Sequence, residues 1–247
     1  MNNPIKEFFT ALGFLTRLAP ARLVDHEALS GCMRWLPVVG LILGGVVICP
    51  FWLLGLLKGH PLVQAWLVVG LNLYLTRGLH LDGLADISDG CASHTQTERF
   101  WAIVKDSHVG AFGALAIAMA VGGQIILLSE LFAAGRYGAA IWCFGLGRAA
   151  AVGFGFIVRT LARPGLGQKF MDGATFPSTV FAILCAVTAG LLLTSTAGVL
   201  LGIGLTVLAL VPLYYLVYTV EGVNGDFLGA AIIIGELASA MGVLLVI

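Results

Sequence analysis

The chain has 247 residues and a formal net charge of zero, with thirteen basic and thirteen acidic side chains. Hydrophobic residues make up 59% of it and charged residues only 11%, whereas soluble domains carry about a quarter charged residues. These values exclude an ordinary soluble domain. A neutral chain also lacks the excess of positive charge that binds nucleic acid. We expect one integral-membrane domain over residues 1–247.

Residues 1–31 show no clean apolar core, so we expect no cleavable signal peptide there. Apolar side chains recur at helical spacing, with Lys6, Glu7 and Thr10 on the other side. The apolar set is Ile5, Phe8, Phe9, Leu12 and Leu15. This pattern predicts an interfacial helix on the bilayer surface, and a helix packed on the bundle is the alternative.

Seven apolar segments follow that are long enough to span, since about 20 residues cross a bilayer. They cover approximately 33–57, 61–77, 111–134, 138–158, 176–195, 197–219 and 227–247. The second segment is short and runs directly into a polar motif. We therefore predict an all-α polytopic membrane protein with about seven transmembrane helices. No internal repeat supports an inverted-repeat transporter.

The basic residues favour a cytoplasmic N-terminus. In that orientation ten of them lie on the cytoplasmic side and two, Lys58 and Arg136, lie on the other, as the positive-inside rule expects. The C-terminus is then periplasmic, and loops 78–110, 159–175 and 220–226 are cytoplasmic. The ten are Lys6, Arg17, Arg22, Arg34, Arg77, Arg99, Lys105, Arg159, Arg163 and Lys169.

Two charged residues, Arg148 and Glu236, fall inside predicted spans. In this orientation both lie about 13–15 Å from the cytoplasmic end of their spans, at 1.5 Å per residue. Isolated charges are costly at such depth. We predict a buried ion pair between the fourth and seventh spans, and a transport relay is the alternative.

Asp82, Asp86 and Asp89 fall within eight positions beside long apolar segments. On a helix, the spacing i, i+4, i+7 places all three carboxylates on one face. Grouped carboxylates repel each other unless a hard cation neutralises them. Mg²⁺ binds one or two carboxylates and keeps room for substrate phosphates. The motif therefore predicts a magnesium–phosphate site at a membrane surface.

The three cytoplasmic loops carry further candidates for binding phosphates. Lys105 and Ser107 suit phosphate oxygens, and Arg163 and Lys169 lie among glycine turns and suit a pyrophosphate. Asp226 begins the last span and is a candidate to join the metal site or to orient a nucleophile. The alternative for the second and third loops is ordinary positive-inside arginines and glycine-rich connections.

The run Arg77-Gly-Leu-His-Leu-Asp-Gly-Leu-Ala-Asp-Ile-Ser-Asp-Gly90 resembles the signature of the cobalamin synthase family. Three later stretches resemble motifs of the same family in the same order, and Phe14-Leu-Thr-Arg-Leu18 resembles its opening. The later stretches are Lys105-Asp-Ser-His-Val-Gly-Ala-Phe-Gly113, Arg163-Pro-Gly-Leu-Gly167 and Gly225-Asp-Phe-Leu-Gly-Ala230.

The resemblance implies transfer of the cobinamide-phosphoryl group of adenosylcobinamide-GDP to the 5′ oxygen of α-ribazole or of its 5′-phosphate. GMP leaves, and adenosylcobalamin or its phosphate forms. Positioning and charge neutralisation are what such a transfer needs. With Mg²⁺ as cofactor, we assign Asp82 and Asp86 as metal ligands. Asp89 is a third ligand or the general base.

In the same scheme Lys105 and Arg163 hold the phosphates. His80 is a weaker candidate base, because on the helical wheel it lies roughly opposite the aspartates. The resemblance also implies the bacterial inner membrane and an active site that faces the cytoplasm. It leaves open a homo-oligomer and association with other enzymes of cobalamin synthesis.

Two alternatives remain at this stage. CDP-alcohol phosphotransferases also place carboxylates on membrane helices, but their Ala-Arg after the first Asp-Gly pair is missing after Asp82-Gly83. A corrinoid transporter without chemistry is the second, and its sign would be a relay of charges within the membrane.

Overall fold

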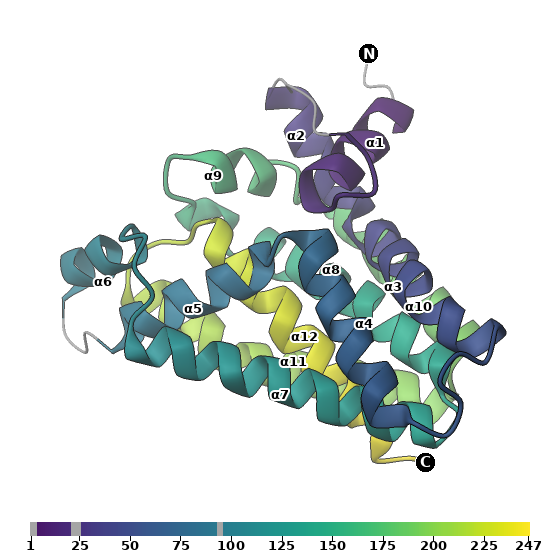
Figure 1. The fold of residues 1–247 in the computed structure, drawn as a ribbon. Helices are drawn as coiled ribbons and strands as arrows, with labels where there is room; N and C mark the ends of the chain where they lie inside the picture. The colour runs from purple at the N-terminus through teal and green to yellow at the C-terminus, as the bar shows by residue number, and fades with distance from the viewer. Residues whose placement is uncertain (1–3, 21–25, 93–95) are drawn as a thin grey trace.

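The computed structural model describes residues 4–20, 26–92 and 96–247, and its regular elements there are all helices (Figure 1). Arg22 and residues 93–95 of the first loop lie outside these ranges. The α-helices are α1 (Pro4–Leu15), α2 (His26–Cys32), α3 (Leu36–Leu53), α4 (Pro61–Thr76), α5 (Leu79–Cys91), α6 (Thr97–Val104), α7 (Ala111–Ala133), α8 (Tyr137–Val158), α9 (Leu166–Met171), α10 (Phe176–Leu193), α11 (Thr196–Thr219) and α12 (Gly225–Leu244). Two short 3₁₀ turns are η1 (Met33–Trp35) and η2 (Arg159–Leu161).

Six helices in the described part of the chain are long and apolar enough to cross a membrane. They are Ala28–Leu53, Ala111–Ala133, Tyr137–Leu161, Phe176–Leu193, Thr196–Thr219 and Gly225–Leu244. Helices α4 and α5 pass the same test only as a pair, and they are bent by 88° at their junction. The predicted all-α fold with about seven spans is confirmed, and the bent pair of α4 and α5 is either a broken span or a re-entrant loop.

The bend between α4 and α5 is made by Arg77 and Gly78, whose φ angles of +59° and +68° are left-handed. Glycine adopts this region freely, whereas arginine does so at a cost. The Arg77 guanidinium offsets that cost by donating from Nη2 to the carbonyls of Gly13, Phe14 and Thr16, at 3.1, 2.9 and 3.3 Å. These bonds close the C-terminal end of α1, so the N-terminal segment fixes where α5 begins.

The two ends of the bundle are formed by different segments of the chain. At one end the Tyr137 hydroxyl lies 2.9 Å from Gln64 Oε1, and its ring stacks on Phe132 and Trp52. At the other end α5, α6 and α9 gather around the beginning of α12, as Figure 1 shows. The C-terminus lies at the first end, away from α9 (Figure 1). The three loops predicted to act together therefore lie at one end of the bundle.

Helices α8 and α12 form the centre of the bundle. Buried residues make up 78% and 72% of their most apolar windows, against 22% in α7, α10 and α11. Gly147 and Gly235 let the two helices approach, because a Cβ at Gly147 would lie 2.6 Å from the Ile232 carbonyl oxygen. Small residues allow such close contacts between membrane helices.

The predicted ion pair between these two helices is confirmed. Arg148 Nη1 donates to Glu236 Oε1 at 2.7 Å and to the Phe144 carbonyl at 2.9 Å. Gln124 of α7 donates from Nε2 to the other carboxylate oxygen at 2.8 Å. Both charged side chains are at most 5% exposed, so the pair ties three helices together inside the bundle.

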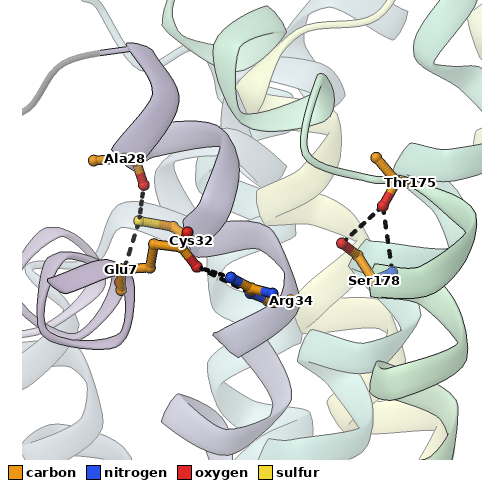
Figure 2. A network of polar contacts seen from close by, with 6 residues as sticks. All are labelled: Glu7, Ala28, Cys32, Arg34, Thr175 and Ser178. Atoms are coloured by element: carbon orange, nitrogen blue, oxygen red, sulfur yellow. Dashed lines mark hydrogen bonds and ion pairs between the residues drawn. The ribbon is translucent and has the colours of Figure 1, made fainter. Parts of the chain in front are cut away.

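Helix α1 packs on the bundle, which is the second of the two alternatives above, and its buried residues come from both sides of the pattern: Leu12 and Leu15 as well as Glu7 and Thr10. Glu7 and Thr10 are buried, whereas Ile5 and Phe9 are 68% and 41% exposed. Figure 2 shows Glu7 paired with Arg34, whose Nε lies 2.9 Å from Oε2. In a helix beside lipid the charged residue has to find its partner in the protein, because lipid offers none.

Figure 2 also shows two sets of local hydrogen bonds at the ends of helices. The Cys32 thiol donates to the carbonyls of Ala28 and Glu7, at 3.0 and 3.6 Å. The Thr175 hydroxyl accepts from the Ser178 amide at 3.4 Å and caps α10. Together with Glu7–Arg34, the thiol bonds hold α1 against α2 and η1.

Charge reversal tests the role of the central pair. Arg148→Glu or Glu236→Arg alone leaves two like charges buried together, and we expect each to reduce the free energy of unfolding by about 3–5 kcal/mol. The double variant should recover part of that loss, because opposite charges face each other again. Thermal unfolding in detergent micelles measures all three, with Arg136→Glu at the exposed end of the bundle as control. A double variant no better than the worse single variant would contradict a stabilising pair.

Candidate functional site

Helix α5 lies directly on the beginning of α12. A Cβ at Gly83 would stand 2.8 Å from both the Cα and the carbonyl oxygen of Asp226. One helical turn away on each helix, a Cβ at Gly229 would stand 3.2 Å from the backbone of His80. With only hydrogen at both glycines the two backbones touch, and residues of α5 come beside the first turn of α12.

This contact groups three carboxylates from two distant parts of the chain. Asp82 is exposed and Asp86 and Asp226 are half-buried. The negative charges of Asp226, Asp82 and Asp89 all act on Asp86. Among the described residues the carboxylates of Asp82 and Asp86 have no hydrogen-bond or ion-pair partner, whereas that of Asp226 accepts from Asn224 Nδ2 at 2.6 Å. We call Asp82, Asp86 and Asp226 the carboxylate cluster.

Asp89 has a different environment from the carboxylate cluster. It is buried, and its Oδ2 and Oδ1 accept from the amides of Gly110 and Gly113 at 2.7 and 2.8 Å. A Cβ at either glycine would stand 2.4 or 2.2 Å from the nearer Asp89 oxygen. The amides at the beginning of a helix favour an anion, and in α7 the Asp89 carboxylate takes that place.

The donor set of the carboxylate cluster fits a hard cation with few protein ligands. Within the described ranges no group of three or more His, Cys, Asp or Glu side chains is placed to hold one metal ion. Mg²⁺ needs no such group, because it binds through one or two carboxylates and substrate phosphates. Asp82 and Asp86 offer two free carboxylates. Asp89 as third ligand or general base stays a prediction that requires it to release its amide bonds.

A cleft of about 340 Å³ opens beside the carboxylate cluster and is shared by α1, α5, α9 and α12. The second and third loops meet there: the Arg163 amide donates to the Val223 carbonyl at 2.9 Å. A Cβ at Gly167 would stand 2.3 Å from the Gly225 nitrogen. The cleft is lined by Phe14, Leu15, Leu36, Leu79, His80, Arg163, Pro164, Gly165, Leu166, Gly167, Phe170, Asn224, Gly225, Asp226, Leu228, Gly229 and Ile232.

Two predicted site residues, Arg163 and His80, line this cleft together with Asp226. The Arg163 guanidinium lies 4.4 Å from the ring centroid of Trp101, which orients the charge by a cation–π contact. Trp101 in turn donates from Nε1 to the Val220 carbonyl at 2.8 Å. His80 is 5% exposed, and its Nε2 has no hydrogen-bond partner among the described residues.

Three other predicted residues lie apart from the cleft. Lys105, Ser107 and Lys169 are exposed, and none of them lines it. In the loop of the first two, His108 Nδ1 lies 2.6 Å from Asp106 Oδ1. That hydrogen bond raises the pKa of His108 and lowers the pKa of Asp106.

Sequence reasoning missed two residues that position this site, Asn224 and Trp101. Asn224 is the N-cap of α12, and its Oδ1 accepts from the Asp226 amide at 3.2 Å. An asparagine before a glycine and an apolar run was a readable capping signal. Trp101 carried no such signal, because its contact with Arg163 joins residues far apart in the chain.

Comparison with known proteins gives one consistent family. The model of the cobalamin-5-phosphate synthase family matches residues 7–244. Adenosylcobinamide-GDP ribazoletransferase of Nitratidesulfovibrio vulgaris strain Hildenborough is 41% identical over 236 residues, 94% of this chain and 96% of that protein. The enzyme of the same name from strain Miyazaki F is 44% identical, over 94% and 92% of the two chains.

A more distant relative supports the same result. Adenosylcobinamide-GDP ribazoletransferase of Klebsiella pneumoniae strain 342 is 34% identical over 250 residues, 97% of this chain and all of that protein. No solved structure matches the chain.

A methyl group added on α7 tests the hydrogen bonds between Asp89 of α5 and the beginning of α7. Gly113→Ala places a Cβ on the Asp89 carboxylate, and we expect it to lower the free energy of unfolding by about 2 kcal/mol through loss of the buried hydrogen bonds. Gly122→Ala on the same helix is the control, because its Cβ would meet nothing within 4 Å. Thermal unfolding in micelles compares them. Equal unfolding temperatures would contradict the role given to Asp89.

Proposed function

This chain belongs to the cobalamin-5-phosphate synthase family, and from that membership we propose that it joins adenosylcobinamide-GDP to α-ribazole or α-ribazole 5′-phosphate. The products are adenosylcobalamin or its 5′-phosphate, and GMP. A phosphorus–oxygen bond of the pyrophosphate breaks, and one forms between the cobinamide-linked phosphorus and an acceptor oxygen. The carboxylate cluster beside a cleft that contains Arg163 is the observation that carries this proposal.

The attacking oxygen differs from the sequence-based expectation, which was the 5′ oxygen. A product described as a 5-phosphate keeps the phosphate at that position. The nucleophile is therefore a ring hydroxyl of the ribose, which is free in both acceptors. Asp226 is well placed to take its proton, because Asn224 fixes the carboxylate at the wall of the cleft.

Positive charge is needed where the pyrophosphate breaks, since GMP leaves with an additional negative charge. Mg²⁺ supplies this charge when it is bound by Asp82 and Asp86. Arg163 presents a planar guanidinium that suits two phosphate oxygens at once, and its stacking on Trp101 holds it in place. Lys105, Ser107 and Lys169 are exposed near this end of the bundle and serve the outer phosphates or the corrinoid.

We also propose the bacterial inner membrane, with the carboxylate cluster facing the cytoplasm. The positive-inside rule supports this orientation, because the end that bears the cluster also bears most of the basic residues. A homo-oligomer and association with other enzymes of cobalamin synthesis are compatible with it.

Release of GMP by the purified protein in liposomes tests the reaction. With adenosylcobinamide-GDP, α-ribazole phosphate and Mg²⁺ we expect acceptor-dependent release, and Asp82→Asn and Asp86→Asn should each reduce it on the order of 100-fold or more. Glu130→Gln, far from the cluster, is the control. Uptake or binding of the corrinoid without release of GMP would favour a transporter. Full activity of both aspartate variants would show that Asp82 and Asp86 do not bind the metal.

Cys91 tests the orientation directly. It is exposed at the end of α5, on the same helix as Asp82 and Asp86. A membrane-impermeant maleimide should label it in inside-out vesicles and leave it unlabelled in right-side-out vesicles. A variant that keeps Cys91 alone removes Cys32, Cys49, Cys143 and Cys185 from the signal. Labelling only from the periplasmic side would reverse the proposed topology.

A further inference from the structure

We propose that the cleft binds the base of the acceptor α-ribazole, with the flat dimethylbenzimidazole ring between α1, α9 and α12. This inference rests on the proposed function and adds which half of the reaction the cleft serves. The donor, adenosylcobinamide-GDP, then approaches from the open side, where Asp82 and Asp86 lie.

The inner part of the cleft is apolar and aromatic. Leu36, Leu228 and Ile232 are at most 7% exposed and form its inner wall. Phe14 and Phe170 line it from α1 and α9, with ring centroids 4.8 Å apart. An aromatic ring that carries methyl groups gains from burial against such side chains, since each buried carbon group contributes about 0.8 kcal/mol.

The polar groups of the cleft discriminate between the two bases in the reaction. Guanine carries several donors and acceptors around its edges, and each of them costs free energy if it is buried without a partner. The lining has four polar side chains, His80, Arg163, Asn224 and Asp226, of which only His80 is as buried as the apolar inner wall. Dimethylbenzimidazole, once attached to ribose, has a single ring nitrogen left to satisfy. The buried inner part of the lining therefore suits the acceptor base better than guanine.

Size excludes the corrinoid from the same place. Clefts for small ligands measure roughly 300–1,000 Å³, and this one has about 340 Å³. A nucleoside fits such a volume, whereas the corrin ring with its side chains does not.

The direction of the cleft fits a nucleoside bound with its ribose outward. From Asp226 to Ile232 the axis of α12 rises about 9 Å, at 1.5 Å per residue. Asp226, Asn224 and Arg163 stand at the outer end. A base among the inner side chains thus places the ribose hydroxyls beside Asp226 and the carboxylate cluster, where the proposed attack takes place.

A change of acceptor preference tests the inference. Leu228→Phe adds bulk to the inner wall, and Leu228→Ala removes it. We measure kcat/KM for α-ribazole and for the α-riboside of unsubstituted benzimidazole in the same preparation, so that the fraction of folded enzyme cancels in their ratio. Leu228→Phe should lower the preference for the dimethylated base about tenfold, as expected for methyl groups that no longer fit. Leu228→Ala should admit the riboside of a larger, tricyclic base.

Ile233→Phe and Ile233→Ala are the matched controls, because Ile233 is buried on the same helix but does not line the cleft. Their preference ratios should equal that of the unmodified protein. If Leu228→Phe instead raises KM for adenosylcobinamide-GDP and leaves the acceptor ratio unchanged, the cleft holds guanine and the inference is wrong. Unchanged constants for both substrates would also overturn it.

Direct binding separates this inference from the proposed function. Equilibrium dialysis of α-ribazole against the protein in micelles needs no turnover. If the unmodified protein releases no GMP yet binds α-ribazole, and Leu228→Phe weakens that binding about tenfold, the reaction fails and the cleft assignment stands. Absence of binding to the unmodified protein would overturn the assignment.

Discussion

At Gly83 and Gly229 the backbones of α5 and α12 touch with no side chain between them. This contact brings Asp226, from the end of the chain, beside Asp82 and Asp86, and it requires α5 to leave the direction of α4 at an angle of 88°. The left-handed pair Arg77 and Gly78 makes that turn. The site thus depends on two glycine contacts and one bend, and a larger side chain at either glycine would push the carboxylates apart.

Two groups of acidic side chains in the described structure differ in how their charge is matched. Glu236, Glu7 and Asp89 are buried, and each is matched inside the protein by a guanidinium or by backbone amides. Such matching is what burial of a charge requires. Asp82 and Asp86 are placed in the opposite way: they face one another and Asp226 at the open end, and no described residue neutralises them. Their environment suits a charge supplied from outside the chain.

Much of this organisation could be predicted from residue patterns. The apolar segments predicted the helices, and the equal depth of Arg148 and Glu236 predicted the ion pair. The distribution of basic residues predicted that three loops lie at one end. The burial of Glu7 and Thr10 on α1 could not be predicted in the same way. Amphipathic periodicity shows which residues share a face, but in a helix beside lipid it does not say which face meets the protein.

The role of Asp89 was hidden for a different reason. Spacing on a helix groups the three aspartates equally, whereas their function depends on what stands opposite each of them. For Asp89 this is the beginning of α7, brought there by the path of the chain through α6. The like charge beside Asp86 also comes from a distant segment, since Asp226 is 140 residues further along.

The two uses of aspartate support each other. Asp89 binds α5 to α7 through two amides, and Gly83 presses the same helix against α12. With α5 held on two sides, Asp82 and Asp86 are fixed about one turn apart on a rigid helix, although neither carboxylate has a partner of its own. A preorganised pair avoids the free-energy cost of bringing two like charges together when the ion and the phosphates arrive. The repulsion between the two carboxylates is offset during folding by burial of apolar surface elsewhere in the bundle and by the hydrogen bonds of Asp89.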